Sequence, residues 1–451
     1  MSVRLIESLA TTEPLAEVFS DVSVLQAMLD FEVALARAEA ELRIIPQSAV
    51  RTIARCSRAE EYETAALARE TLRAGTPGIP LVKALRKRVQ QEDARAADFV
   101  HWGATSQDVA DTALVLLLKK GAQILDADLA RIEKALRPFV AKHSKAVMLG
   151  RTLLQPAPPV TMGLKAAGWL ASIRRGRVRL QRAFSEALVL QFGGASGTLA
   201  ALGNRGPRVA ELMAKRLRVN FSGAPWHTHR DRLAEVACSC GILTGSLGKM
   251  ARDISLMMQH EVGEASEPGE GGRGGSSTMP QKRNPIASAI ALAAANRVPG
   301  LTAAFLSQMV QEHERGVGGW QAEWPTMSEL IQSTGVAIAS MAEVGEGLTV
   351  SPMRMKENLK STQGTIFAEK AALLLTAKLG REAAHEALER ATDPKKMRGR
   401  TLAQVLADIP EAQIDKKLLA SVEDPEEYLG AAQVFTARLL SSTRGRQRGR
   451  K

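Results

Sequence analysis

A hydrophobic repeat of 3.5 residues between about Arg230 and Val262 constrains the fold of this chain most. Its apolar side chains alternate at spacings of three and four, and they are Leu233, Val236, Cys240, Leu243, Leu247, Met250, Ile254 and Met257. This spacing is the seam of a helix that packs along other helices, and about 30 residues at 1.5 Å each extend over roughly 45–50 Å. One small domain cannot cover such a helix. We therefore expect a long helical bundle that is shared between subunits.

Three further segments complete the expected bundle, and they are Thr112 to about His143, Pro159–Leu190 and Pro285 to about Gln311. Asp111 is placed to cap the first of these helices, because a short acidic side chain accepts hydrogen bonds from the free amides of a first turn. Aromatic residues make up only 4% of the chain, and a composition dominated by Ala and Leu favours helices over sheets. The sequence therefore predicts an all-α fold.

The helical segments fall into three regions and a tail. We expect an N-terminal helical domain over 1–110, a central long-helix bundle over 111–348, a C-terminal helical domain over 349–440 and a basic tail over 441–451. The tail carries five cations and no acid from Arg444 to Lys451, so we expect it to be disordered. No aromatic residues are interleaved with these cations, and a role in nucleic-acid binding is therefore disfavoured.

Composition narrows the class of protein further. Three cysteines are too few for a disulfide framework, no stretch of 18 apolar residues predicts a membrane span, and the N-terminus lacks a signal pattern. We therefore expect a reduced, cytoplasmic protein without a membrane partner. The net charge of +12 suits an anionic substrate.

The most informative local feature is a Gly-rich stretch that runs into Gly275-Ser-Ser-Thr-Met-Pro-Gln-Lys-Arg-Asn-Pro285. Five glycines fall between Gly269 and Gly275, so the backbone has little intrinsic stiffness there. Hydroxyl, amide and cationic side chains follow, and Pro285 suits the first position of the next helix. A solvated linker is the alternative. We favour a mobile loop that delivers donors to a helix start and closes over an anionic substrate.

Two more polar clusters interrupt apolar helices. The first, His101-Trp-Gly-Ala-Thr-Ser-Gln-Asp108, places donor side chains at the start of a helix, where backbone amides favour an anion. A plain capping segment explains it equally well. The second is Gly150-Arg-Thr-Leu-Leu-Gln-Pro-Ala-Pro-Pro-Val-Thr161. Its arginine is suited to a bidentate contact with a carboxylate, although a Pro-rich connection is the simpler interpretation of this cluster alone.

A weaker cluster is Trp226-His-Thr-His-Arg-Asp-Arg232. His227 and His229 have no third or fourth ligand at a recognisable spacing, so we expect no metal site. Arg315, near the end of another helix, is a secondary candidate for substrate contact. The sequence contains no dinucleotide-binding fingerprint and no phosphate-binding loop, and we expect no cofactor.

In their order along the chain, the three clusters resemble those of the fumarase/aspartase superfamily, which includes the argininosuccinate and adenylosuccinate lyases. The loop that ends at Pro285 carries the most specific part of this resemblance. Four features are also similar to bacterial 3-carboxy-cis,cis-muconate cycloisomerases, and they are His101–Asp108, Leu190–Gly197, Pro225–His227 together with Arg230–Arg232, and Gln311–Arg315.

The resemblance implies a homotetramer with a twenty-helix core, in which three subunits build each active site. It also implies a cofactor-free reaction through a carbanion next to a carboxylate. Ser276 would exchange the proton, and Lys282 would stabilise the negative charge. The substrate-binding residues would be His101, Thr105, Ser106, Gln107, Arg151, Thr152, Gln155, Ser277, Asn284 and Arg315.

Two departures bear on the substrate. Many of the lyases have a histidine where this chain has Leu153, and the muconate cycloisomerases usually have tryptophan there. Because leucine cannot donate a proton, a general-acid histidine at this position is excluded. Gln281 also stands where histidine is common. We expect a lactonizing cycloisomerase in aromatic-acid (protocatechuate) breakdown that acts on 3-carboxymuconate. A 3-sulfomuconate cycloisomerase and a fumarate-releasing lyase such as adenylosuccinate lyase are the alternatives.

Overall fold

The computed structural model describes residues 5–269, 274–275, 277–409, 415, 419 and 421–441. The chain divides into two compact units. Unit 1 comprises Met1–Ala130, Arg175–Gly248 and Ile290–Ser340, and unit 2 comprises Arg131–Arg174, Lys249–Ala289 and Met341–Lys451. The predicted division into three domains differs from this partition and stays a prediction. Except for Ser441, the basic tail lies outside the described residues.

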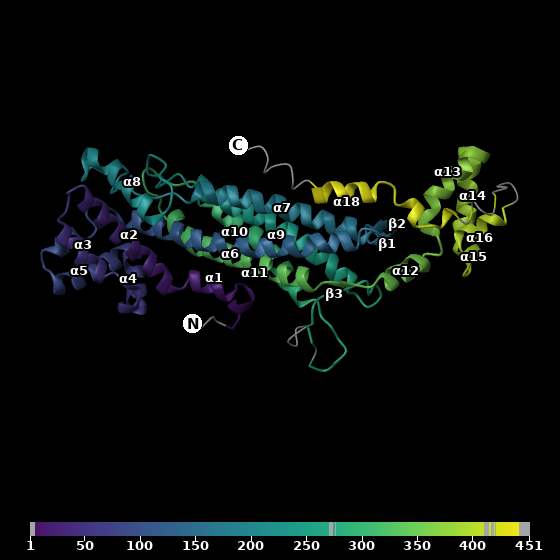
Figure 1. Ribbon diagram of the computed structural model, residues 1–451, viewed down its shortest axis with the longest axis horizontal. Coiled ribbons are helices and arrows are strands. Elements are labelled where there is room, and N and C mark those ends of the chain that lie inside the picture. The colour runs from purple at the N-terminus through teal and green to yellow at the C-terminus, as the bar shows by residue number, and fades with distance from the viewer. Residues whose placement is uncertain are drawn as a thin grey trace. The chain divides into compact units, whose positions relative to one another are not determined.

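Long helices dominate the chain and confirm the predicted all-α class (Figure 1). Each contributes residues to both units, and they are α6 (Ser106–Lys142), α7 (Met162–Ala187), α9 (Asp231–Met257), α10 (Ile286–Ser307) and α11 (Gly319–Gly347). Four of them match the four predicted segments. The fifth, α11, was not predicted. All eight residues of the 3.5-residue seam lie on α9 and are buried.

Within unit 1 the long helices pack without space for extra atoms. A Cβ atom added to Gly176 of α7 would lie 2.7 Å from Leu243 of α9, and one added to Gly248 of α9 would lie 2.7 Å from Ala295 of α10. Both separations are too short for real carbon atoms. Glycine at these positions therefore allows neighbouring helices to approach closely, which close-packed interiors require.

Shorter helices complete unit 1. They are α1 (Glu13–Val18), α2 (Asp21–Glu41), α3 (Gln47–Arg55), α4 (Thr64–Ala74), α5 (Gly78–Glu92) and α8 (Gly206–Leu217), with 3₁₀ turns at Glu7–Leu9, Ala59–Glu61, Ala96–Phe99 and Gly203–Arg205. The side chain of Ser20 caps α2 by accepting a hydrogen bond from the backbone N–H of Ser23. Phe31 and Leu35 of α2 are buried in an apolar cluster with residues of α3, α5 and α8.

Unit 2 holds short strands and small helices. β1 (Val147–Thr152) pairs antiparallel with β2 (Gln155–Thr161), and β3 (Ala265–Ser266) pairs with β4 (Thr349–Val350). The helices are α12 (Pro352–Ser361), α13 (Ala368–Leu379), α14 (Arg381–Thr392), α15 (Pro394–Met397), α16 (Leu402–Ala407) and α18 (Ala432–Ser441), with 3₁₀ turns at Thr365–Phe367 and Glu426–Tyr428. Leu375, Leu402 and Leu406 belong to their apolar core.

Two sequence expectations about the long helices need correction. α6 begins at Ser106 instead of near Thr112, so Asp111 lies inside the helix and does not cap it. The Asp111 carboxylate is instead hydrogen-bonded to Arg230 and Trp320. The second correction concerns Gln155–Thr161, a Pro-rich stretch that forms strand β2 and not a plain connection.

α10 has an unusual exposed surface. Among the described helices, it alone is long and apolar enough to cross a membrane by length and composition, with a mean hydropathy of 1.4 over its 18-residue window. A helix in the core of a soluble protein passes the same test. Only 22% of this apolar stretch is fully buried within the chain, so part of the helix is left exposed by its own chain.

Candidate active site

The first predicted cluster forms a buried junction around Asp108, inside unit 1. Asp108 lies in the first turn of α6 and is fully buried. Its Oδ1 atom accepts hydrogen bonds from His227 Nε2 at 2.8 Å, Gly193 N at 3.0 Å and Gln191 Nε2 at 3.2 Å. Its Oδ2 atom accepts from Gly194 N at 2.8 Å and Thr105 N at 3.1 Å. One carboxyl group therefore joins three segments that are far apart in the sequence.

Glycines allow the segment after α7 to reach this carboxyl group. A Cβ atom on Gly193 would lie 2.7 Å from the His227 ring, so a larger residue would displace the histidine. Gly194 has a φ of +68°, a conformation that costs glycine little. Gly193 and Gly194 thus allow consecutive backbone N–H groups to point at Asp108.

A buried cation, Arg230, pairs with two buried acids beside the junction. Its guanidinium is bonded to the carboxylate of Asp111 at 2.8 and 3.1 Å and to that of Glu323 at 2.9 Å. It also lies 4.7 Å from the ring centroid of Trp226. All three charged side chains are fully buried. The sequence alone indicated no partner for Arg230, because Asp111 is 119 residues away.

The balance of charge in this group is one cation against two acids. Burial raises the pKa of Glu323 to about 7, against the opposing effect of Arg230. Burial of a carboxylate in an apolar interior favours its neutral form, whereas a neighbouring guanidinium favours the ionised form. Asp111 has a further donor besides Arg230, because Trp320 Nε1 donates a hydrogen bond to its carboxylate at 3.0 Å.

His227 takes part in this junction as a hydrogen-bonding residue. Among the described residues, no group of three or more His, Cys, Asp or Glu side chains is placed to hold a metal ion. The ring of His227 is 5% exposed and donates to Asp108. Its backbone carbonyl accepts from Gln107 Nε2 at 2.8 Å. Gln107, a predicted substrate-binding residue, is itself fully buried, and its Oε1 atom has no hydrogen-bond partner among the described residues.

Three of the predicted binding residues, Thr105, Ser106 and Arg315, are partly accessible and lie next to the junction. Thr105 and Ser106 are half-buried at the start of α6. Arg315 donates from Nη1 to Thr105 Oγ1 at 3.1 Å and from Nη2 to the carbonyl of Ala195 at 3.0 Å. The structure therefore brings Arg315, predicted from a separate segment, to the first cluster. A guanidinium beside two hydroxyls at a helix start is suited to an anion.

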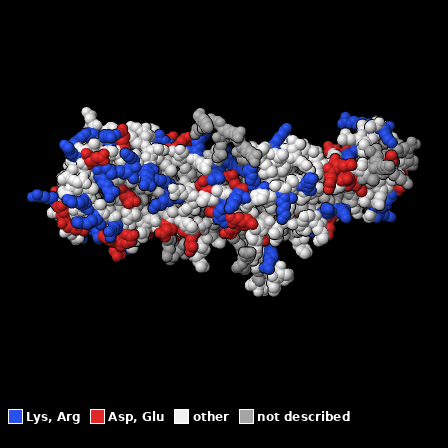
Figure 2. Space-filling view, in the orientation of Figure 1, with Lys and Arg blue, Asp and Glu red and all other residues white. Residues whose placement is uncertain are grey.

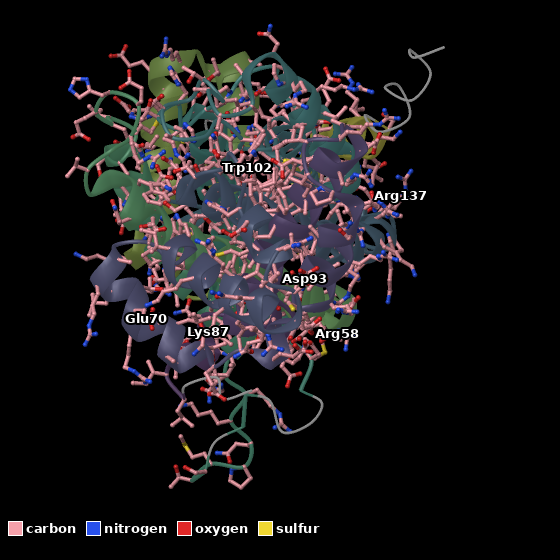
Figure 3. The ribbon with its side chains drawn as sticks, turned by 90° about the vertical axis from the view of Figure 1, so that its left-hand side faces the viewer. Arg58, Glu70, Lys87, Asp93, Trp102 and Arg137 are labelled. Atoms are coloured by element: carbon pink, nitrogen blue, oxygen red, sulfur yellow. The ribbon has the colours of Figure 1, made fainter. Side chains whose placement is uncertain are left out.

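His101 completes this part of unit 1. Its Nδ1 atom lies 2.7 Å from Oε1 of Glu32, a residue of α2 that is 2% exposed. Burial alone would lower the pKa of His101, but the charge and hydrogen bond of Glu32, together with Asp108, hold this pKa above its ordinary value. The next residue, Trp102, is labelled in Figure 3 and is 44% exposed. Because its pKa is raised, the imidazole of His101 keeps its charge to a higher pH than a free histidine does.

The second cluster forms the β1–β2 hairpin of unit 2. Thr152 pairs with Gln155, so Leu153 and Leu154 alone make the turn. Both have a positive φ, at 51° and 66°, as in the tightest hairpin turns that Asn and Gly normally occupy. The two leucines are 97% and 75% exposed. These two exposed apolar side chains are therefore stabilised little by packing within their own chain.

Arg151 already has a carboxylate partner within unit 2. Its Nη1 and Nη2 atoms donate to the two oxygens of Glu264, each at 2.9 Å. Asn358 of α12 donates to the same carboxylate at 2.8 Å. Glu264 is fully buried. This bidentate pair orients the arginine at the base of the hairpin, and direct binding of substrate by Arg151 stays a prediction.

The third cluster leads into α10. Ser276 lies outside the described residues, whereas Ser277, Gln281 and Lys282 are exposed. The backbone N–H of Asn284 donates to the carbonyl of Gly274 at 2.8 Å, which closes the loop on itself. The side chain of Glu267 accepts from Ala287 N at 3.0 Å and Ser288 N at 2.8 Å, and it thereby caps α10 from a distant part of the chain.

Long helices with separate polar clusters at or near their ends define the fold of a class of protein, the all-α lyases. The chain belongs to the lyase family. The family model described as "Lyase" matches residues 7–300, and the model described as "Adenylosuccinate lyase C-terminus" matches residues 364–439.

Three relatives illustrate how far the similarity extends. The chain is 48% identical to a 3-carboxy-cis,cis-muconate cycloisomerase of Bradyrhizobium diazoefficiens over 94% of each chain. It is 39% identical to a nitrosuccinate lyase of Streptomyces davaonensis, over 93% of this chain and 90% of that protein. The crystal structure of a 3-carboxy-cis,cis-muconate lactonizing enzyme from Pseudomonas putida superposes with a TM-score of 0.91 at 44% identity, covering 97% of this chain and 98% of the other.

Proposed function

We propose that the chain is a 3-carboxy-cis,cis-muconate cycloisomerase that needs no cofactor. The observation that carries this proposal is the 48% identity to an enzyme of that name across 94% of both chains. The similarity of the fold to a lactonizing enzyme at a TM-score of 0.91 also supports it. The chain is also similar to a nitrosuccinate lyase, at the lower identity of 39%. We therefore keep a lyase, in particular a fumarate-releasing one, as the second candidate.

The reaction requires anion stabilisation. In the lactonizing direction, a carboxylate oxygen of the substrate forms a bond to one carbon of the diene, and a proton is delivered to the carbon next to another carboxylate. The intermediate is a dianionic enediolate, which cations and N–H donors that are already in place stabilise most effectively. Lys282 and Asn284 would supply such donors, and Ser276 would exchange the proton. Thr105, Ser106 and Arg315 would hold a carboxylate of the substrate.

The site is completed between copies of the chain, as a homotetramer. Two exposed surfaces support this part of the proposal. One is the strained turn with Leu153 and Leu154, whose apolar side chains are exposed. The other is α10, an apolar helix of which only 22% of the most apolar stretch is fully buried. Burial of such surfaces against another copy would stabilise the assembly, since burial of apolar area contributes about 25 cal/mol per Å².

Leu153 and Gln281 are the positions that we assign to substrate specificity. A leucine at the hairpin tip offers a smaller side chain than tryptophan and no N–H donor. A substituted muconate with a 3-sulfo group is therefore an alternative substrate. Comparison of kcat/KM for 3-carboxymuconate and 3-sulfomuconate decides between them, and a strong preference for the sulfonate would replace the carboxylate in our proposal.

The direct test is an ultraviolet assay of diene loss with 3-carboxy-cis,cis-muconate. We expect rapid loss with the wild-type protein and a loss of activity of about 10²-fold or more for Ser276→Ala, the range that a proton-transfer group contributes. Ser266→Ala, on β3 of the same unit, is the matched control and should keep its activity. A full rate for Ser276→Ala would refute the role of this serine. Release of fumarate from argininosuccinate or adenylosuccinate, without muconate turnover, would favour the lyase.

A further inference from the structure

A cavity of about 780 Å³ lies in unit 1, where the start of α5 meets the loop before α6. Its wall includes Thr105 and Ser106 of the first cluster together with residues of α5. A Cβ atom on Gly78, the first residue of α5, would lie 2.8 Å from the Cβ atom of Ser106. Glycine is therefore required for the two helix starts to meet. The starts of two helices, which are the positive ends of their dipoles, therefore meet at this place.

Cationic side chains line the cavity along one face of α5. Lys83, Arg86 and Lys87 follow the three- and four-residue spacing of a single helix face, and no Asp or Glu is among the described lining residues. Lys87, labelled in Figure 3 together with Glu70 of the preceding helix, forms no ion pair with a described residue. The other two have only loose partners, since Lys83 lies 3.9 Å from Glu70 and Arg86 lies 3.4 Å from Asp98.

His101 lines the same cavity. Glu32 is bonded to its Nδ1 atom and is not in the cavity wall, because Glu32 is 2% exposed. Three cations and an imidazole therefore face a space whose described wall contains no Asp or Glu. Charged side chains arranged in this way attract an anion from solution. Lys and Arg side chains also gather over the N-terminal helices on the face shown in Figure 2.

A tricarboxylate has one more charge than the cyclisation uses. One carboxylate forms the new carbon–oxygen bond, and a second carries the enediolate. The third carboxylate takes no part in either change of bonding, but it must lose water when the substrate binds, which is costly unless a cation faces it. Lys282 and Asn284 are assigned to the enediolate, and Arg315 with Thr105 and Ser106 is assigned to a reacting carboxylate. The third carboxylate therefore has no assigned cation.

We propose that the α5 face of Lys83, Arg86 and Lys87, with His101, binds the carboxylate substituent that distinguishes 3-carboxymuconate from unsubstituted muconate. This inference rests on the proposed function and extends the substrate site along α5. Thr105 and Ser106 hold the reacting part of the molecule at one end of the cavity. The α5 cations bind the substituent, and they set the affinity for the substrate more than the rate of the chemical step.

The test compares two substrates. For Lys83→Gln/Lys87→Gln, we expect KM for 3-carboxymuconate to rise about tenfold with kcat changed less than twofold, because uniform binding is lost while the chemical step is not. Unsubstituted cis,cis-muconate should show no change in kcat/KM. Lys83→Arg/Lys87→Arg should restore most of the affinity. Lys120→Gln on α6, which removes one exposed positive charge elsewhere in unit 1, is the control for net charge and should leave KM unchanged.

A binding measurement separates this inference from the proposed function. Calorimetry with tricarballylate, a saturated tricarboxylate, and with glutarate, a dicarboxylate, needs no turnover. We expect the double Gln variant to lose about tenfold in affinity for tricarballylate and little for glutarate. Equal loss for both ligands, or no loss for either, would overturn the α5 assignment even if the protein turns over 3-carboxymuconate. Failure of turnover with the expected loss in binding would refute only the proposed reaction.

Discussion

The junction around Asp108 and the hairpin tip at Leu153 and Leu154 both carry predicted site residues, but they are built in opposite ways. Asp108 is fully buried and accepts five hydrogen bonds from residues of its own unit. The hairpin tip has two residues at positive φ with exposed apolar side chains. The Asp108 carboxyl group has its hydrogen-bond partners within one chain. The two leucines of the tip have little cover from their own chain.

The difference shows how a single chain can prepare a site that it does not complete. Buried polar groups must be paired inside the folded chain, because each unpaired group costs about 1–3 kcal/mol. Strain at an exposed turn is tolerated where the side chains gain their stabilisation on assembly. In the proposed assembly, the first cluster would supply a preorganised half of the site, and the hairpin would supply an element suited to docking.

Replacement of Arg230 is the change with the largest expected effect. Arg230→Met leaves Asp111 and Glu323 buried without their cation, and we expect a loss of about 3–5 kcal/mol in the free energy of unfolding. Denaturant unfolding followed by circular dichroism measures it. Arg182→Met removes an arginine that pairs with Glu235 and is 68% exposed, so the matched loss should be far smaller, because exposed ion pairs contribute little to stability. Equal losses for the two variants would contradict the special role of the buried cation.

Glu39 shows where the interior of unit 1 is not satisfied. Both of its carboxyl oxygens are buried without a hydrogen-bond partner among the described residues. Burial, and then the charge of Glu32, raises its pKa to about 9. The folded state therefore keeps a proton that the unfolded state has lost above its ordinary pKa of 4.5. The contribution of Glu39 to stability is therefore most favourable below that value and declines as the pH rises towards 9, by up to about 1.4 kcal/mol per pH unit.

Glu39→Gln should remove most of this slope. We expect the unfolding free energy of the variant to depend much less on pH between about 5 and 8 than that of the wild type. Glu41→Gln is the control on the same helix, because Glu41 is exposed and paired with Arg216. If Glu39→Gln leaves the slope unchanged, a different group causes the pH dependence.

The hairpin tip is expected to affect turnover and not stability. In Leu153→Asn/Leu154→Gly, the turn gains the residues that its φ angles favour, and we expect the unfolding temperature of the variant to stay the same or rise. Turnover should fall about tenfold or more, because the docked leucines are lost. Leu72→Asn on α4 removes another leucine, which is 87% exposed, and should leave turnover unchanged. A fully active Asn-Gly variant would show that the tip does no more than close the hairpin.

The sequence predicted the parts of this comparison unequally. The 3.5-residue seam identified α9, and three glycine- or proline-marked polar clusters were found because they interrupt apolar helices. α11 was missed, although Met327, Leu330, Ile331 and Ile338 follow helical spacing in it. Pro325 lies inside this helix and Gly318 precedes it, and both residues ordinarily signal breaks.

The pairings of the buried junction could not be predicted. Arg230 meets Asp111 and Glu323 across separations of 119 and 93 residues, and one sequence contains no signal for contacts of that range. The same holds for Asp108 and His227. Local rules assigned Asp111 to a helix cap, since they weigh only the next turn. Tertiary burial decided otherwise.

The central claim is that the site is completed between copies of the chain, and we infer that one copy supplies the first cluster and another copy supplies the loop before α10. It is tested most directly by mixing two inactive variants, Ser106→Ala and Lys282→Ala, after dissociation and joint reassembly. Random exchange in equal amounts gives about one quarter of the sites an intact pair of clusters, so activity should recover towards a quarter of the wild-type value. Affinity tags on each variant confirm that mixed oligomers form. Mixed oligomers that are no more active than the two parents would contradict the account.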